Sequence, residues 1–174
     1  MKKIIAFGAS NSQNSINKKL ATYAANQFAN VKIEILDLND FEMPIYSIDR
    51  EKSEGLLELA HTFFNKIGSA DLLIISFAEY NGAYTSAFKN IFDWASRINS
   101  KTFQEKPTLL MATATGPRGG ATVLEIAKNR FPHQGANVVG TFVLPSFNTN
   151  FQENEIVNDE LKAELLSIIQ DIEF

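Results

Sequence analysis

A polar loop at residues 8–17 is the first segment whose side chains suit a specific chemistry. Its sequence, Gly-Ala-Ser-Asn-Ser-Gln-Asn-Ser-Ile-Asn, follows an apolar run and holds three serines, three asparagines and no acidic residue. It leads into a segment of helical period, so these groups would lie at a helix N-terminus, where unpaired N–H groups and partial positive charge favour an anion. Asn14 or Ser15 alone would indicate only a helix N-cap, but the cluster favours a phosphate. The loop matches neither a Walker A sequence nor Gly-x-Gly-x-x-Gly, so we expect a mononucleotide or another phosphorylated compound.

Two further loops carry residues suited to a ring system. Residues 78–86, Ala-Glu-Tyr-Asn-Gly-Ala-Tyr-Thr-Ser, combine two tyrosines with an Asn-Gly pair, which would set flat apolar surface beside backbone amides, as a planar heterocycle requires. Residues 113–120, Thr-Ala-Thr-Gly-Pro-Arg-Gly-Gly, contain three glycines that let backbone approach a ligand. Arg118 adds a charge suited to a carbonyl edge or an anion. Taken singly, these loops are also compatible with an Asn-Gly turn and an ordinary turn before a helix.

Short apolar runs alternate five times with segments of helical period, and these elements determine where the loops lie. The expected strands are 4–7, 31–36, 71–77, 108–113 and 138–144, and the expected helices are 15–28, 56–67, 88–98, 123–131 and 161–172. Such alternation predicts one α/β domain, residues 1–174, with a five-stranded parallel sheet in the order 2-1-3-4-5 and helices on both faces. Ligands of such sheets bind beyond the carboxyl ends of the strands. Because the three loops follow strands one, three and four, we expect them to lie together.

The composition excludes several other classes of protein. The chain has 174 residues, a net charge of −4, two histidines and no cysteine. A general nucleic-acid binder would show an excess of basic residues. Without cysteine there is no disulfide scaffold, thiolate zinc site or iron–sulfur cluster. The N-terminal apolar run is too short for a signal peptide or a membrane span, so we expect a cytoplasmic protein with neither a membrane nor a nucleic acid as partner.

Several of these residues resemble motifs of the NADPH-dependent FMN reductase family of flavodoxin-like flavoproteins. That family has a phosphate loop of the type Gly-Ser-x-Arg-x-x-Ser-x-Asn, to which residues 8–17 correspond. It also has a Glu-Tyr-Asn-Gly sequence running on to Lys-Asn-x-x-Asp-Trp, which recurs here at residues 79–94. A glycine pair after strand four corresponds to Gly119 and Gly120. The resemblance extends over about residues 4–151 and implies a flavodoxin-like fold.

The resemblance also implies a bound FMN, with its phosphate in the first loop and its ring along the other two. The implied cofactor-binding residues are Ser10, Ser12, Ser15, Ile16, Asn17, Glu79, Tyr80, Asn81, Gly82, Thr115, Gly116, Arg118, Gly119 and Gly120. Asn11 stands where the family has arginine, so the phosphate charge would be balanced by Lys18, Lys19 or the helix amides. The flavin does the redox work itself, so we assign no catalytic side chain and no metal ligand. Tyr80, Tyr84 and Arg118 are expected to border the ring face that admits hydride.

Three functions are compatible with these observations. The resemblance favours an FMN-dependent NAD(P)H oxidoreductase that reduces a small-molecule acceptor, namely a flavin, quinone, azo compound or metal ion. A non-enzymatic electron carrier like flavodoxin is the first alternative, although such carriers are far more acidic than this chain. A flavin-free module that binds a phosphorylated metabolite is the second.

A homodimer or homotetramer is implied by the resemblance, through the helix that carries Lys89, Asn90 and Trp94. The residues themselves also suggest it, because Phe92 and Trp94 add apolar surface beyond the stripe that would face the sheet. The alternative is a wide core stripe beneath residues 39–52.

Overall fold

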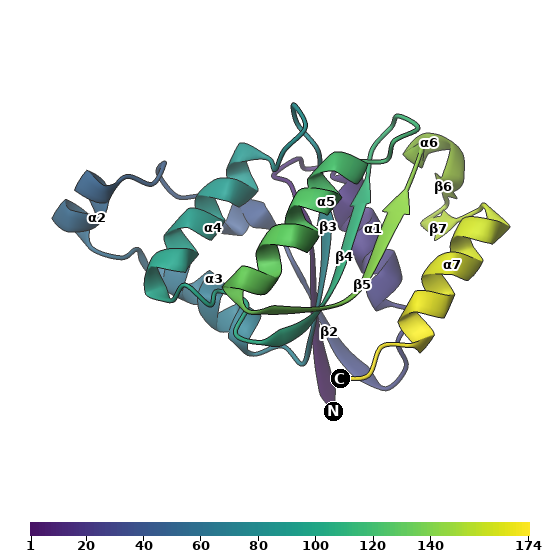
Figure 1. The fold of residues 1–174 in the computed structure, drawn as a ribbon, viewed down its shortest axis with the longest axis horizontal. Helices are drawn as coiled ribbons and strands as arrows, with labels where there is room; N and C mark the ends of the chain where they lie inside the picture. Colours follow the sequence, from purple (N-terminus) through teal and green to yellow (C-terminus); the bar gives the residue numbers. More distant parts are fainter.

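A five-stranded parallel sheet forms the middle layer of the computed structural model, which describes residues 1–174 (Figure 1). The strand order is β2-β1-β3-β4-β5, as the alternation of elements predicted. The strands are β1 (Lys2–Ala9), β2 (Val31–Leu36), β3 (Leu72–Phe77), β4 (Lys106–Thr113) and β5 (Ala136–Leu144). Neighbouring strands are parallel throughout, so all their carboxyl ends lie at one edge of the sheet.

Residue type explains which strands are central. β3 is buried along its whole length, and β1 is buried from Ile4 to Ala9, because apolar side chains on both faces of the sheet meet a helical layer. β2 lies at an edge and is only partly buried. Its alternation of apolar residues with Lys32 and Glu34 predicted this edge position.

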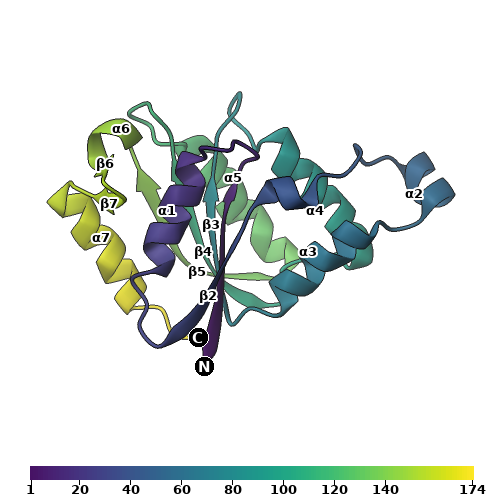
Figure 2. The ribbon, with the colours of Figure 1, turned by 180° about the vertical axis from the view of Figure 1, so that it is seen from behind.

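Helices cover both faces of the sheet. Their bounds are α1 (Ile16–Ala25), α2 (Ile48–Glu54), α3 (Glu58–Gly68), α4 (Ser86–Ile98), α5 (Ala121–Arg130), α6 (Phe147–Asn150) and α7 (Asp159–Gln170), with 3-10 turns at Leu38–Phe41 and Phe131–Gln134. α1 and α7 pack on one face, and α3, α4 and α5 pack on the other (Figures 1 and 2). A small hairpin of β6 (Phe151–Gln152) and β7 (Glu155–Ile156) precedes α7. None of the helices has the length and apolar character that crossing a membrane requires.

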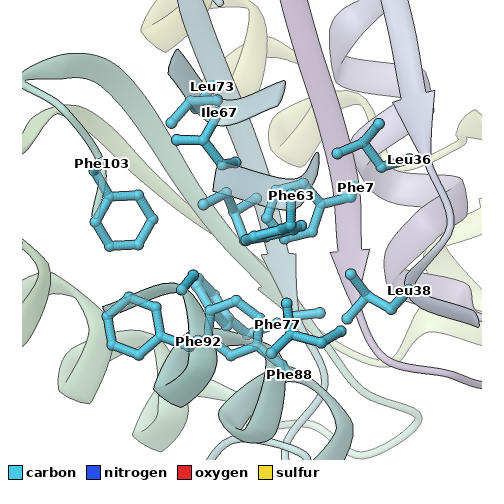
Figure 3. Close-up of a cluster of buried hydrophobic side chains, with 14 of the residues drawn as sticks. Phe7, Leu36, Leu38, Phe63, Ile67, Leu73, Phe77, Phe88, Phe92 and Phe103 are labelled. Atoms are coloured by element: carbon cyan, nitrogen blue, oxygen red, sulfur yellow. The ribbon is translucent and has the colours of Figure 1, made fainter. Parts of the chain in front are cut away.

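Phenylalanine side chains fill the space between the sheet and α3, α4 and α5 (Figure 3). Phe7 of β1 meets Phe63 of α3 edge to face, with 5.8 Å between ring centroids, and Phe77 of β3 meets Phe88 of α4 at 5.6 Å. Each aromatic pair with this geometry stabilises the fold by about 0.5–1.5 kcal/mol, in addition to the contribution from burying its apolar area. Phe77 is the last residue of β3, so this aromatic layer supports the loops that begin at the carboxyl edge.

Residues 42–57, which contain α2 and which we call the arm, form a segment that the sequence pattern did not predict as helical. α2 has no buried residue, and it projects from the body of the molecule (Figure 1). The arm is attached to α4, because Asn90 Nδ2 donates to the Met43 carbonyl at 2.9 Å and Trp94 Nε1 donates to the Pro44 carbonyl at 2.8 Å. A helix this short, without an apolar stripe, leaves no periodic signal in the sequence.

The apolar surface of α4 that suggested an oligomer is covered within the chain. Trp94 is 0% exposed and Phe92 is 7% exposed. Tyr46 of the arm meets Trp94 edge to face at 5.2 Å, and Phe92 stacks on Phe131 at 5.7 Å. The wide core stripe beneath residues 39–52 is therefore the arrangement found, and these two side chains give no support to an oligomer.

We expect the Glu34 carboxylate to stabilise the fold at neutral pH and to lose that contribution in acid. Hydrogen bonds from Lys3 and Lys66 hold the pKa of Glu34 below its ordinary value of 4.5. Because the folded pKa is the lower one, the stabilisation is complete above the ordinary value and disappears as the pH falls through the folded pKa. The pairs are partly exposed, so the gain is at most about 1 kcal/mol.

Urea unfolding of wild type and Glu34→Gln, from neutral pH to about pH 3, measures this contribution. The difference in free energy of unfolding should shrink toward zero on acidification. A difference that stays constant with pH would show that the charge of Glu34 plays no part.

Candidate functional site

The three loops singled out in the sequence meet at the carboxyl edge of the sheet. Between the ends of β1, β3 and β4 they form a cavity of about 250 Å³, which we call the loop cavity. Its lining consists of Ser10, Ser12, Asn14, Ser15, Ile16, Asn17, Ala78, Glu79, Tyr80, Thr113, Ala114 and Thr115. The topology alone predicted this meeting of loops.

The predicted binding residues fall into two groups. Those that line the loop cavity are Ser10, Ser12, Ser15, Ile16, Asn17, Glu79, Tyr80 and Thr115. Those outside its lining are Asn81, Gly82, Gly116, Arg118, Gly119 and Gly120. The prediction missed Asn14, Ala78, Thr113 and Ala114, which also line it. Asn14 belongs to the polar cluster itself, and the other three lie where β3 and β4 end, so including the strand ends would have found them.

Ser15 caps the N-terminus of α1 at the floor of the loop cavity. Its Oγ accepts a hydrogen bond from the Lys18 N–H at 3.1 Å, and the side chain is buried. The N-cap expected at Asn14 or Ser15 is therefore Ser15. The N–H groups of Ile16 and Asn17, in the first turn, have no acceptor within the helix, so they are available to an anion.

Gly8 lets α1 begin directly on top of β1. A Cβ at this position would lie 2.3 Å from the Lys18 backbone nitrogen and 2.8 Å from the Asn17 carbonyl carbon. Both contacts are far shorter than van der Waals distance and involve backbone, which cannot rotate away. The absence of a side chain at Gly8 therefore sets the height of the first loop above the sheet.

Asn17 connects the first loop to the ends of β3 and β4. Its side chain is 1% exposed. Its Nδ2 donates to the Thr113 carbonyl at 3.1 Å, and its Oδ1 accepts from Ser76 Oγ at 2.7 Å and from the Thr113 N–H at 3.0 Å. An asparagine side chain has two donor hydrogens and two acceptor positions, so one Nδ2 hydrogen is left for a ligand. Most of the hydrogen-bonding capacity predicted for a phosphate is thus used to join the loops.

The second loop is joined to the first by Thr85. Its Oγ1 donates to the Ala9 carbonyl at 3.0 Å and accepts from the Phe88 N–H at 3.1 Å, so the same hydroxyl caps α4. In the same loop, Tyr80 pairs with Ala83, and the two residues between them, Asn81 and Gly82, form a turn in which both have positive φ. The Asn-Gly pair is therefore a tight turn, as the simpler interpretation of this loop proposed.

Tyr84 does not border the loop cavity, contrary to expectation. Its ring packs into the core against Phe77, Phe88 and Phe131, with centroid distances of 5.5 to 5.9 Å. Burial raises the pKa of Tyr84 to about 12. Tyr80, by contrast, is 54% exposed and lines the cavity. The large apolar neighbours of Tyr84 in α4 and after α5 draw its ring inward, which the spacing of the two tyrosines did not reveal.

The glycine pair of the third loop serves the packing of α5. Gly119 and Gly120 have φ values of 58° and 79°, in the left-handed region. A Cβ on Gly119 would lie 2.6 Å from Val143 Cγ1, and one on Gly120 would lie 3.1 Å from Ala112 Cβ. Both positions therefore require glycine for contact with the sheet. Arg118 points along α5, where its Nη2 donates to Thr122 Oγ1 at 2.8 Å.

No lysine, arginine or histidine lines the loop cavity. Lys18 is paired with Asp37 at 2.5 Å, and this hydrogen bond is the main reason that the pKa of Asp37 is lowered. Lys19 lines a different cavity, between α1 and the β6–β7 hairpin. Of the three sources of positive charge considered from the sequence, the N-terminus of α1 is the one directed at the site. No group of His, Cys, Asp or Glu side chains forms a metal-binding cluster.

A second cavity, of about 200 Å³, lies on the other side of the first loop. Asn11, the arm and the start of α4 line it, and its walls are more apolar than those of the loop cavity. Ile45 stands at its rim and is 84% exposed. None of the predicted binding residues reaches it.

Comparison with known proteins assigns this chain to a family. The family model described as NADPH-dependent FMN reductase matches residues 2–149. An uncharacterised protein of Mycoplasma pneumoniae is 28% identical over 157 residues, which cover 87% of this chain and 92% of that protein. An NADPH azoreductase of a Bacillus species is 33% identical over 60% of this chain and 54% of the enzyme. A quinone reductase of Escherichia coli is 31% identical over 46% of this chain and 43% of the enzyme. The similarity thus spans about half the length of these two named enzymes.

Solved structures share the fold. The flavoenzyme FerB of Paracoccus denitrificans, an NAD(P)H:(acceptor) oxidoreductase, superposes with a TM-score of 0.77 at 20% identity, covering 98% of this chain and 94% of that one. An NADH:FMN oxidoreductase superposes with a TM-score of 0.71 at 19% identity, covering 98% and 87%. At these identities the superpositions establish a flavodoxin-like architecture. Because the family model matches most of the sequence, from the start of β1 into α6, this chain belongs to the NADPH-dependent FMN reductase family.

Proposed function

We propose that this chain is an FMN-dependent oxidoreductase that takes electrons from NAD(P)H and passes them to a small-molecule acceptor. The observation that carries the proposal is the loop cavity, where a helix N-terminus, buried hydroxyls and an exposed tyrosine surround one space at the carboxyl edge of the sheet. When bound, FMN would supply the redox chemistry by accepting a hydride. Quinones, azo compounds, free flavins and metal ions are the acceptors that we consider.

The residues at the loop cavity fit the two chemically different ends of FMN. The phosphate would lie at the first turn of α1, held by the N–H groups of Ile16 and Asn17 and by the hydroxyls of Ser10 and Ser12. The ring would lie toward Tyr80. The cavity, at about 250 Å³, is slightly smaller than the roughly 300–1,000 Å³ of typical ligand pockets, so the protein would enclose part of the cofactor and leave a ring face open to the hydride donor.

The remaining predicted residues belong to the outer part of this site in the proposal. Backbone groups could reach the ring from Asn81 and Gly82, at the exposed turn, and from Gly116, after β4. All three residues are close in sequence to residues that line the cavity. Gly119 and Gly120 would act by holding α5 in place. A cytoplasmic location, where NAD(P)H is available, also belongs to the proposal.

A visible spectrum and an anaerobic reduction test the proposal against its alternatives. The purified protein, loaded with FMN and passed over a desalting column, should retain about one yellow flavin per chain, and NAD(P)H should bleach it within seconds. Retained flavin that NAD(P)H does not bleach would support an electron carrier. Absence of flavin after loading would leave the phosphorylated-metabolite module. The net charge of −4 favours the enzyme over a carrier.

We expect Arg118→Ala to slow reduction by NAD(P)H without weakening FMN binding. The guanidinium lies outside the loop cavity on an exposed loop, so it is free to contact the phosphates of an incoming dinucleotide. Losing such a contact should lower the rate by about ten- to a hundredfold. Stopped-flow bleaching measures the rate, and FMN titration provides the control. An equal rate in both proteins would remove Arg118 from the site, and loss of FMN would show that the ring is held differently.

We also propose that the chain forms a homodimer or homotetramer. This proposal rests on the exposed apolar surface of the arm, because the apolar face of α4 is covered within the chain. Ile45 and Ile48 of the arm are 84% and 56% exposed, and the second cavity beside Ile45 has partly apolar walls. A second copy of the chain would cover this surface. Sedimentation at micromolar concentration should give a species larger than one chain, and Ile45→Glu with Ile48→Glu should dissociate it. A wild-type monomer would overturn the proposal.

A further inference from the structure

Glu79 makes a contact that the prediction of a flavin-binding loop did not include. It follows β3 and lines the loop cavity between Ala78 and Tyr80. Its Oε2 accepts a hydrogen bond from the Val123 N–H at 2.9 Å, in the first turn of α5. The carboxylate therefore connects the second loop to the helix that follows the third.

This contact replaces an N-cap that α5 cannot supply itself. The N-cap residue is Gly120, which has no side chain to accept a hydrogen bond. A larger residue is disfavoured there, because φ is positive and a Cβ would crowd Ala112. A carboxylate at a helix N-terminus satisfies an N–H group and counters the partial positive charge of the helix. Glu79 does this from a position 44 residues away in the sequence.

The charge of Glu79 is not balanced by any cation at the loop cavity. It is the one carboxylate among the lining residues, which include no lysine, arginine or histidine. Its full negative charge outweighs the roughly half positive charge at the N-terminus of α5. The part of the cavity near β3 and β4 is therefore electronegative, whereas the part at α1 is not.

We infer that Glu79 is a positioning residue that also keeps the reduction potential of the bound flavin low; this inference rests on the proposed function. Two-electron reduction increases the negative charge that the ring carries near neutral pH, and a nearby carboxylate disfavours that charge. By occupying the N-terminus of α5, Glu79 also removes a positive potential that would otherwise stabilise the reduced ring. A low potential favours rapid transfer of electrons onward to an acceptor.

Glu79→Gln separates charge from structure. The glutamine side-chain oxygen can still accept from the Val123 N–H, so the cap is kept while the charge is lost. Glu125→Gln is the matched control, because it removes a carboxylate on the same helix that lies outside the loop cavity and pairs with Lys128 at 3.8 Å. Glu79→Ala removes both charge and cap and should lower the thermal unfolding midpoint as well.

The readout is the flavin reduction potential, measured by equilibration with a dye of known potential under anaerobic conditions. At a fixed potential, the ratio of reduced to oxidised flavin should rise at least tenfold in Glu79→Gln, which corresponds to about 30 mV for a two-electron couple, and should stay unchanged in Glu125→Gln. The unfolding midpoint of Glu79→Gln should remain close to that of wild type, because the hydrogen bond to the Val123 N–H is kept.

The outcomes distinguish the inference from the proposed function. If wild type binds FMN and the potential of Glu79→Gln equals that of wild type, Glu79 only caps α5 and the inference is wrong. If both carboxylate variants shift the potential equally, the effect is one of general charge and the inference is again wrong. If wild type fails to bind FMN in a fluorescence titration, the proposed function is overturned, and the inference falls with it.

Discussion

Ser15→Asp should abolish FMN retention while leaving α1 folded. Aspartate is as good an N-cap as serine, so the hydrogen bond that Ser15 Oγ now accepts from the Lys18 N–H at 3.1 Å can be kept. The new carboxylate, however, would lie beside the proposed phosphate in a cavity whose lining has no cation. Two like charges about 4 Å apart repel by about 4 kcal/mol at an effective dielectric constant of about 20, which predicts an affinity loss of about a thousandfold.

Quenching of flavin fluorescence measures this loss, and two comparisons isolate its cause. Ser15→Asn is a neutral N-cap and should bind FMN within about tenfold of wild type. Riboflavin, which lacks the phosphate, should bind Ser15→Asp and wild type equally. If Ser15→Asp retained FMN like wild type, the phosphate would have to lie elsewhere in the molecule.

Gly8→Ala should be the most damaging single-methyl substitution in the site. The added Cβ would lie 2.3 Å from the Lys18 nitrogen, so the first turn of α1 would have to rise from the sheet. That movement would break the hydrogen bonds that the Asn17 side chain shares with Thr113 and Ser76. We expect a loss of about 3 kcal/mol or more in the free energy of unfolding, together with loss of FMN binding.

Gly116→Ala is the matched control for Gly8→Ala. It lies in the third loop, and a Cβ there would meet nothing within 4 Å, so its unfolding free energy should change by no more than about 0.5 kcal/mol. Urea denaturation of both variants, with FMN titration at low urea, provides the comparison. Equal stabilities of the two variants would contradict the close packing of α1 on β1.

The sequence by itself was sufficient to predict the order of the strands and the meeting of the three loops at one edge of the sheet. Continuous apolar runs such as residues 71–77 predicted central strands, and the polar alternation in residues 31–36 predicted an edge strand; both are confirmed. These predictions succeed because burial on one or two faces dictates a local periodicity. Once the strand order follows from right-handed crossovers, the three loops must share one edge of the sheet, whatever their detailed conformation.

The sequence signal failed where a segment has no periodic face to bury. Residues 39–52 show no helical period in the sequence, because α2 buries nothing. The attachment of the arm to α4 explains why Trp94 is buried within the chain. The apolar pattern of α4 was correctly recognised, but the identity of the segment that covers it depends on a contact 50 residues away.

Only the tertiary structure decided which side chains face the loop cavity. Three of the four hydrogen-bonding groups of the Asn17 side chain are used by Ser76 and by Thr113, which lies 96 residues further along. Tyr84 turns into the aromatic core. Glu79 was predicted to contact the flavin but also caps α5. The physical reason is that a loop side chain has several rotamers of similar energy until a distant partner selects one. Local sequence therefore determines which loops form the loop cavity, and long-range hydrogen bonds and packing determine which of their atoms remain available to a ligand.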